Sequence, residues 1–422
     1  MSTKTTRVCV RLLGHVFAIA AATCVLSLAI SSCGGGGVGS GGTGSPESTF
    51  GDGSFSSGTV TGFGSVVVDG IAYDDTRTTV TVEASPNVLT PAMAGLGQFA
   101  ELEFEASSAQ EAIRSIRIEA AAVGRVDSVD AAGHVLTVLG QTVVENTSSD
   151  AGPVTFYFGA AGLSSLNAGD AVEVHGVPRW NDRSGRYELL AARIDKLPSA
   201  PTMQRMGGVV QNESAGSTGR TFRLGALQIV YGATLPAGST LRDGDRVIVW
   251  SDQPVSAGSL RANAVRVVPR SLPAAGKDAR LGGTVSRLDT ASQRFDLAGV
   301  EVRYGNAKVT PNGNGFSLEN GVYVLVEGAY AAESGIDAKH IKIRKRGAPD
   351  YVEVELTGPI QGFIDVGNFS VRGTPVDALG VKPLQACGNA SLHEALNVRI
   401  EGHVQAGAAG SVVKAESVRC VN

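Results

Sequence analysis

The chain is short of the residue types that build large aromatic cores, redox centres or strongly charged faces. Its 422 residues include 5 Cys, 4 Met and 2 Trp, and aromatic residues make up only 5%. Neither charge is in strong excess, because 36 Lys and Arg stand against 40 Asp and Glu. A dedicated nucleic-acid-binding protein normally carries a basic face. We therefore expect no nucleic-acid partner.

Familiar catalytic motifs are also missing. The sequence contains no GxSxG elbow, no HExxH helix and no CxxC pair. The paired carboxylates Asp74/Asp75 and Asp243/Asp245 have the chemistry for acid–base work. They fall in segments typical of turns, where Asp is favoured because it hydrogen-bonds to the backbone, and we prefer that interpretation. The sequence thus indicates a protein that is not an enzyme and needs no cofactor.

Residues 1–32 have the pattern of a bacterial lipoprotein signal peptide. Three basic residues precede an apolar stretch from Leu12 to Ile30. This stretch could also be a membrane helix, but it ends in Ile-Ser-Ser-Cys33, which resembles the lipobox whose Cys receives diacylglycerol. We expect Cys33 to be lipidated and to anchor the chain to a membrane. Because Gly34, not Asp, follows, we expect a cell-envelope protein at the outer membrane.

Glycine is abundant, with 55 residues, and 10 of them lie just after this signal, between Gly34 and Gly53. Residues 33–57 are rich in Gly and Ser, which predicts a flexible tether with a reach of roughly 25–30 Å. Residues 37–42 match the dinucleotide-binding pattern GxGxxG. No strand is expected before them and no helix after them, so the phosphate-binding geometry is missing. We interpret them as part of the tether.

One eleven-residue stretch organises the rest of the chain, because it occurs five times at intervals of about 75 residues. Two of its positions are apolar in every copy, as Val172 and Val174 illustrate. A fixed period of this size marks tandem copies of a small domain. The copies begin at Leu96, Leu166, Leu241, Leu318 and Leu392.

Each repeat reads as a series of short strands. Apolar residues alternate with polar ones, which predicts strands with one face inward and one face toward solvent. Residues Ser107–Ala122 have a composition that favours a helix, but the equivalent segments of the other copies favour a strand, and we expect a strand. About five strands per repeat predict an all-β array of small antiparallel barrels of the five-stranded OB type. An open five-stranded sandwich is the alternative.

The expected modules are small enough to need support from each other. Domains of this size lie near the limit of independent stability, so we expect neighbouring copies to pack together or to unfold at different denaturant concentrations. The expected boundaries are 58–122 for module 1, 123–197 for module 2, 207–268 for module 3, 282–346 for module 4 and 352–422 for module 5.

The repeat pattern can be compared with a known family. The lipobox, the tether and tandem units of the form GxV…FxVxG…LxxGDxVxVxG…AxxI are similar to the bacterial domain of unknown function 5666, over most of residues 58–422. The resemblance implies a cell-envelope lipoprotein and supplies no reaction. Module 5 departs from the pattern at Ala395-Leu396, where other copies have Gly-Asp. This departure puts the turn of module 5 in doubt.

Two cysteines outside the signal and the lipobox, Cys387 and Cys420, both lie in module 5. In an oxidising envelope we expect them to form a disulfide. A metal site shared with His393 and His403 is the competing interpretation, but the spacing does not match a zinc motif. We therefore expect no metal site. We expect the histidines of the other modules to lie at the surface, namely His134, His175 and His340.

Two features are candidates for ligand contact. Trp180 and Tyr187 flank a polar insertion that the other copies lack, and loop aromatics suit sugar or peptide recognition; a simple hairpin is the alternative. Lys342 and Arg344 lie in a basic segment suited to anionic headgroups or phosphorylated glycan, or simply to an exposed strand. We expect a non-catalytic envelope lipoprotein that acts as a structural or protein-interaction array. The alternative is a protein that binds glycan or another ligand.

Overall fold

The described residues are almost entirely β-strand. The computed structural model describes residues 54–104, 113–216, 219–232, 240–268, 276–313, 315–331, 335–382 and 391–421. Within them the only helical element is a single 3₁₀ turn, Leu163–Ser165. None of these residues forms a helix long and apolar enough to cross a membrane. The predicted all-β class, built from several small closed barrels, is confirmed.

Module 2 shows the strand circuit that the other modules repeat. When its five main strands are numbered in chain order, they pair as 1-2-3-5-4-1, which closes the barrel. All neighbours are antiparallel except the third and fifth strands, which are parallel. The five strands are β8 (Ala122–Asp130), β9 (Val135–Val138), β10 (Gln141–Glu145), β12 (Ala171–Asn181) and β13 (Arg186–Lys196). An additional short strand, β11 (Phe156–Phe158), pairs with β13.

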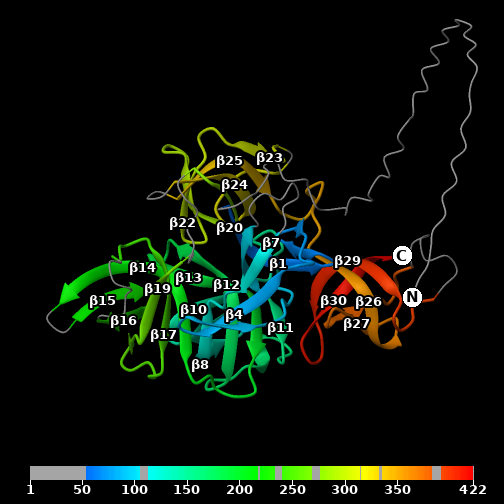
Figure 1. Cartoon of the computed structure of the whole chain (residues 1–422), viewed down its shortest axis with the longest axis horizontal. Helices are drawn as coiled ribbons and strands as arrows, with labels where there is room; N and C mark the ends of the chain where they lie inside the picture. The colour runs from blue at the N-terminus through cyan, green and yellow to red at the C-terminus, as the bar shows by residue number, and fades with distance from the viewer. Residues whose placement is uncertain are drawn as a thin grey trace, which may run out of the picture. The chain divides into compact units, whose positions relative to one another are not determined.

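Modules 1 and 3 follow the same circuit with small variations (Figure 1). Module 1 has β1 (Phe55–Phe63), β2 (Val66–Val68), β3 (Ile71–Tyr73), β4 (Thr79–Ser85), β5 (Val88–Pro91), β6 (Phe99–Phe104) and β7 (Ile113–Ile118). Its parallel pair is β4 with β7. Module 3 has β14 (Gln204–Gly216), β15 (Gly219–Leu224), β16 (Leu227–Tyr231), β17 (Arg246–Ser251), β18 (Ser259–Arg261) and β19 (Ala264–Val267). Its closing strand is divided between β18 and β19.

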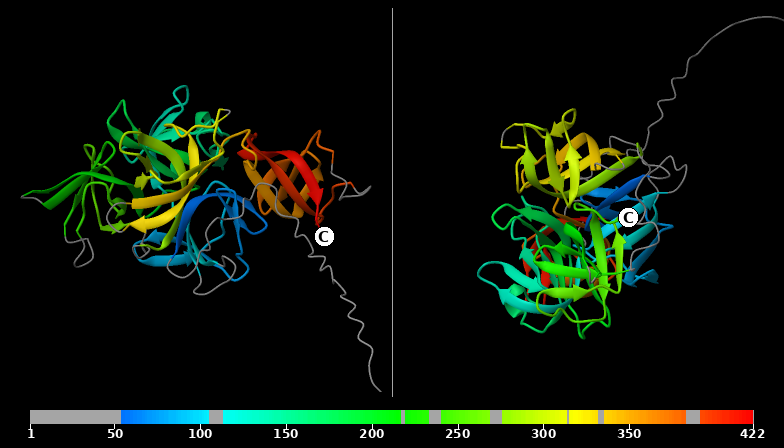
Figure 2. Two further views of the ribbon diagram at one scale, coloured as in Figure 1. Left: turned by 90° about the horizontal axis from the view of Figure 1, so that it is seen from above. Right: turned by 90° about the vertical axis from the view of Figure 1, so that its left-hand side faces the viewer.

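Modules 4 and 5 close in the same way, and the barrel of module 5 (orange to red) is visible in Figure 2. Module 4 has β20 (Asp278–Asp289), β21 (Arg294–Leu297), β22 (Val300–Arg303), β23 (Lys308–Thr310), β24 (Tyr323–Ala331) and β25 (Gly335–Ile343). Module 5 has β26 (Val354–Asp365), β27 (Asn368–Val371), β28 (Thr374–Asp377), β29 (Asn397–Ala406) and β30 (Ser411–Cys420).

Two local expectations can now be compared with the structure. The segment whose composition favours a helix contains strand β7, so the choice of a strand is correct for the part that is described. Strand β1 begins at Phe55, within the segment expected to be tether.

The two apolar positions of the eleven-residue stretch point into the barrels in every module. Each of these side chains is at most 2% exposed. They are Leu102 and Phe104, Val172 and Val174, Val247 and Val249, Val324 and Val326, and Val398 and Ile400. The period-two interpretation of this stretch is therefore confirmed.

A recurring turn fastens the start of this stretch to the first strand of each module. In module 2 the amide of Gly169, at φ 91°, donates to the carbonyl oxygen of Val126 at 2.8 Å. The equivalent bond occurs in all five modules. In module 5 it comes from Ala395, which adopts φ 64° and donates to Ile360 at 2.9 Å. The doubtful turn of module 5 thus keeps its shape without glycine.

The glycine that ends the stretch marks a β-bulge. In modules 2, 4 and 5 the register of the last two strands shifts at this residue. A Cβ on Gly176 would lie 2.1 Å from the carbonyl oxygen of Leu190, and Gly328 and Gly402 are equally crowded. Glycine is required here because the neighbouring backbone approaches too closely for any side chain.

The modules are joined by strand pairing as well as by side chains. Strand β1 pairs in parallel with β20 of module 4 and with β26 of module 5. Strand β14 of module 3 pairs with β8 of module 2. The predicted packing between copies is therefore confirmed, and it extends to copies that are not neighbours in the sequence.

The expectation that the outer strand faces meet solvent is wrong at these contacts. Outward-facing His175 and Trp250 are 0% and 1% exposed. The charged side chains of Glu83, Arg205 and Arg280 are also buried. The physical reason is that side chains of another module cover these faces, or, for Trp250, that Arg205 and Arg266 of the same module lie over the ring. Alternation within one strand cannot reveal either arrangement.

Candidate functional site

The predicted aromatic pair lies on the β12–β13 hairpin of module 2. Trp180 and Tyr187 are directly opposite each other across the two strands. Their rings meet edge to face, with centroids 5.1 Å apart. Such pairing fixes both rings on the hairpin and adds roughly 0.5–1.5 kcal/mol beyond their burial.

The same hairpin contacts module 4. The Tyr187 hydroxyl donates a short hydrogen bond to the buried carboxylate of Asp296. The guanidinium carbon of Arg287 lies 5.0 Å from the centre of the Trp180 ring. Burial, followed by the charge and hydrogen bond of Asp296, raises the pKa of Tyr187. These contacts use both aromatic side chains to hold two modules together.

An open cleft of about 620 Å³ lies beside this contact, between modules 2, 3 and 4. Its lining includes Tyr187, Arg246, Arg287, Asp296 and Glu301. Arg246 also lies over the Phe99 ring of module 1, at 5.7 Å. The cleft carries both signs of charge, so it does not select cations or anions by charge alone.

Lys342 and Arg344 follow each other on the same face at the end of module 4 but differ in environment. The Lys342 ammonium lies 3.4 Å from Asp350. Arg344 is only 5% exposed and donates to the carbonyl oxygen of Val352 at 3.4 Å. The structure therefore places Arg344 inside the protein, whereas Lys342 remains near the surface.

Asp69 is a buried carboxylate close to Arg344. Its Oδ1 accepts hydrogen bonds from the Tyr323 hydroxyl at 2.6 Å and from the Thr59 amide at 3.2 Å. Its Oδ2 has no hydrogen-bond partner among the described residues. Burial raises the pKa of Asp69 to about 6, against the opposing effects of these bonds and of the Arg344 charge.

The predicted lipidation and disulfide sites are only partly within the described residues. Cys33 and Cys387 lie outside them. Cys420, at the end of β30, is disulfide-bonded. The pairing of Cys420 with Cys387 stays a prediction.

A buried ionic cluster joins modules 1 and 3. Arg205 is 2% exposed, pairs with the Glu119 carboxylate and donates to the carbonyl oxygen of Glu83 at 2.8 Å. Arg266 bonds to the carboxylates of Glu83 at 2.7 Å and Glu119 at 3.2 Å. Both guanidinium carbons lie 5.5 Å from the Trp250 ring. Burial lowers the pKa of Arg205 to about 9. The two arginines and the two glutamates therefore pair with each other within the junction.

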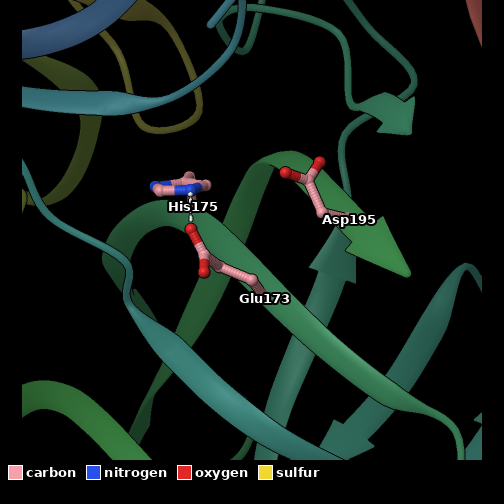
Figure 3. A group of neighbouring side chains, drawn as sticks. All are labelled: Glu173, His175 and Asp195. Carbon is pink, nitrogen blue, oxygen red and sulfur yellow. Dashed lines mark hydrogen bonds and ion pairs between the residues drawn. The ribbon is translucent and has the colours of Figure 1, made fainter. Parts of the chain in front are cut away.

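A second polar cluster, drawn in Figure 3, lies on strands β12 and β13 of module 2. Glu173 and His175 are two residues apart on β12, and Asp195 is directly opposite Glu173 on β13. Each offers one ligand atom, and these atoms all lie within 4.8 Å of one another. The His175 Nε2 is 2.8 Å from Glu173 Oε1. This is the group of side chains in the described residues whose chemistry best fits a small-ligand site.

The expectation that His175 lies at the surface is wrong, because module 1 covers it. Its Nδ1 is 3.3 Å from the carbonyl oxygen of Glu119, and the Gln98 carboxamide is 3.5 Å from Nε2. His134 remains exposed at 54%, whereas the His340 side chain is 12% exposed. The sequence could have indicated this cluster through Glu173 and His175, which share the outward face of one strand. The strand register that adds Asp195 cannot be derived from the sequence alone.

Comparison with known proteins agrees with the strand circuit. The family model described as domain of unknown function (DUF5666) matches residues 123–195 and 282–342, which are modules 2 and 4. Two regions of this chain are therefore similar to DUF5666. The matched regions contain the complete five-strand circuit, and the remaining three modules repeat it. The two regions similar to DUF5666 are thus small closed β-barrels in this protein.

Other comparisons add little to the DUF5666 assignment. A search of curated proteins gives no match. A solved structure titled "drosophila Unr CSD456" is 14% identical, and the similarity covers 51% of this chain and 96% of that chain. Its TM-score is 0.14. A likeness at this score carries no argument about the arrangement or the ligand of the DUF5666 modules.

Proposed function

We propose that this protein is a non-catalytic lipoprotein of the cell envelope whose five modules act together as a rigid scaffold for protein interaction. The observation that carries the proposal is strand β1, which pairs with strands of modules 4 and 5 as well as with its own barrel. An array of independent binding domains needs no such shared strand. A scaffold that holds its modules at fixed positions does.

The distribution of buried charge supports the same proposal. Arg205, Arg266, Glu83 and Glu119 bond to one another between modules 1 and 3 instead of facing a cleft. Trp180 and Tyr187, which a glycan would need as open ring faces, are engaged by each other and by module 4. These contacts favour a structural array over the glycan-binding alternative.

One exposed apolar surface suits a protein partner. We call it the apolar tip of module 5, and it consists of Ile364, Val366 and Leu379, which are 71%, 40% and 63% exposed. The first two residues lie at the β26–β27 turn, and the amide of Ala378 donates to the carbonyl oxygen of Val366. Exposed apolar residues gathered at one end of a soluble domain are typical of contact sites.

The anchor is proposed to be a lipid on Cys33, which places the scaffold in the envelope, at the outer membrane. Fatty-acid labelling in cells tests this directly. We expect the chain to be labelled and to fractionate with membranes, and Cys33→Ala to remove both properties. A labelled Cys33→Ala chain, or an unlabelled natural chain, contradicts the anchor.

The interaction is tested by photo-crosslinking in intact cells. A photoreactive residue at Ile364 is expected to give a discrete adduct, whereas the same residue at Val88, which is 53% exposed on module 1, is not. Leu379→Asp should remove the Ile364 adduct while the unfolding midpoint stays unchanged. Equal adducts at both positions, or none at Ile364, would refute contact through this tip.

A further inference from the structure

We infer that Glu173, His175 and Asp195 form a binding site for one divalent transition-metal ion. The three side chains present one imidazole nitrogen and two carboxylate oxygens from adjacent strands, all within 4.8 Å of one another. Ligand atoms around a tetrahedral zinc ion lie roughly 3.4 Å apart when each is about 2.1 Å from the metal. Small side-chain rotations bring the three atoms to that spacing.

The backbone holds the Glu173 and Asp195 carboxylates opposite each other, with Arg193 as the cation that pairs with Asp195. Glu173 and Asp195 are direct cross-strand partners, and Val172, Val174 and Ile194 on either side are core residues. Neither carboxylate can therefore turn to the other face of the sheet. Like charges directly opposite on neighbouring strands destabilise the pair. A bound cation removes this repulsion.

The orientation of His175 is that of a metal ligand. Its Nδ1 is 3.3 Å from the carbonyl oxygen of Glu119, so Nδ1 is the nitrogen placed to donate a proton. Metal-binding histidines usually donate the other ring N–H to a carbonyl or carboxylate in this way. The Nε2 lone pair then points toward Oε1 of Glu173, which is itself an acceptor, at 2.8 Å. An ion bound by both atoms satisfies the two acceptors.

Partners within the protein compete with an ion for this position. His175 bonds to Glu173 at 2.8 Å and Arg193 to Asp195 at 2.6 Å, so both carboxylates have partners without a metal. The Arg193 guanidinium also opposes a second positive charge nearby. We therefore expect weaker binding than at a structural zinc site of four protein ligands.

The donor set selects the class of ion. Imidazole with two carboxylates suits Zn²⁺ and Mn²⁺, whereas Mg²⁺ and Ca²⁺ prefer sites made entirely of oxygen. Zn²⁺ should bind more tightly than Mn²⁺. The Glu173 side chain is 24% exposed, which gives the ion access from solvent. Three protein ligands leave a coordination position open to water.

The site is tested with the full chain, purified in detergent and freed of metal by a chelator. Titration with Zn²⁺ alone, followed by calorimetry, is expected to show one ion per chain. His175→Gln and Asp195→Asn should each weaken binding at least tenfold. His134→Gln is the matched control, because His134 also pairs with a glutamate, Glu145 at 2.7 Å, without a third ligand. It should bind Zn²⁺ as the natural chain does.

A spectroscopic measurement on the natural chain tests the site without depending on whether a variant folds. X-ray absorption at the zinc edge of the natural chain should show one imidazole among oxygen ligands. The absence of saturable Zn²⁺ binding overturns the site. So does binding that folded His175→Gln and Asp195→Asn retain unchanged, or a zinc spectrum without imidazole.

Discussion

Ala395 occupies a backbone conformation that the other four modules give to glycine. Its φ is 64°, and its amide makes the same bond to the first strand that Gly97, Gly169, Gly244 and Gly321 make. For a residue with a Cβ this left-handed region costs roughly 1–2 kcal/mol. The turn forms despite that cost because the hydrogen bond and the packing of Leu396 hold it.

Replacing Ala395 with Gly should therefore stabilise module 5. We expect the free energy of unfolding to rise by about 0.5–1 kcal/mol, less than the full strain because glycine also loosens the unfolded chain. Denaturant unfolding followed through module 5 measures the change. Gly321→Ala in module 4 is the reciprocal control and should destabilise by a similar amount, since φ is 91° and no atom lies within 4 Å of the added Cβ. A destabilised Ala395→Gly chain would contradict this account.

At the scale of single elements, the two-residue hairpin turns explain why a glycine recurs at the same place in the repeats. The β2–β3 hairpin turns through Asp69 and Gly70, both with positive φ, and Leu139-Gly140, Ala298-Gly299 and Arg372-Gly373 do the same in modules 2, 4 and 5. Two such residues make the type I′ turn, whose twist matches the flanking strands. In module 3 the glycine occupies the first turn position instead of the second, and Gly225 alone has a positive φ.

The β2–β3 turn also carries a pH-sensitive carboxylate. The pKa of Asp69 is about 6 in the folded chain against an ordinary value of 3.8. Its neutral form is therefore favoured by folding. The resulting stability is fully present below about pH 4 and is lost as the pH rises through 6. Two pKa units correspond to about 3 kcal/mol.

Asp69→Asn should remove this dependence while keeping the turn, because Asn also accepts positive φ. We expect the free energy of unfolding of the natural chain, relative to this variant, to fall by up to about 3 kcal/mol between pH 4 and pH 7. Urea unfolding of both chains across this range provides the measurement. A difference that stays constant with pH would show that Asp69 does not titrate as described.

The burial of inward-facing strand residues could be predicted from the sequence, but the burial of outward-facing residues could not. The alternation of apolar and polar residues identified Val172 and Val174 as core residues. This was possible because the pattern within a single strand determines which of its side chains face the barrel interior. His175 lies on the opposite face, and it is buried by residues of module 1 that are distant in the chain. The cluster with Asp195 depends on strand register, and the contact of Tyr187 with Asp296 depends on module placement. Neither quantity is encoded in a local pattern.

At the scale of the whole molecule, the junction of modules 1 and 3 should be sensitive to the loss of a single charge. Removing one partner of a buried ion pair leaves the other uncompensated. Arg205→Met is expected to lower the free energy of unfolding by about 3 kcal/mol, and the double change Arg205→Met with Glu119→Leu to recover part of that loss. A double-mutant cycle on unfolding free energies measures the coupling.

An exposed ion pair in module 3 supplies the control for this cycle. Arg220 pairs with Glu213 at 2.7 Å, but its side chain is 45% exposed. Arg220→Met should therefore change stability by less than about 1 kcal/mol. If Arg205→Met were as mild as Arg220→Met, the buried cluster would not hold the junction together.

The position of β1 also has a consequence for the order of assembly. Phe55 lies near the beginning of the described residues, yet it pairs with Ala279, and Gly62 pairs with Glu355. When the chain emerges amino end first during synthesis, most of its length must therefore be made before this strand is fully enclosed. Long-range pairing of this kind is slow to form and leaves an edge that other chains can join. The interval before modules 4 and 5 enclose this strand is when we expect the protein to be most prone to aggregate.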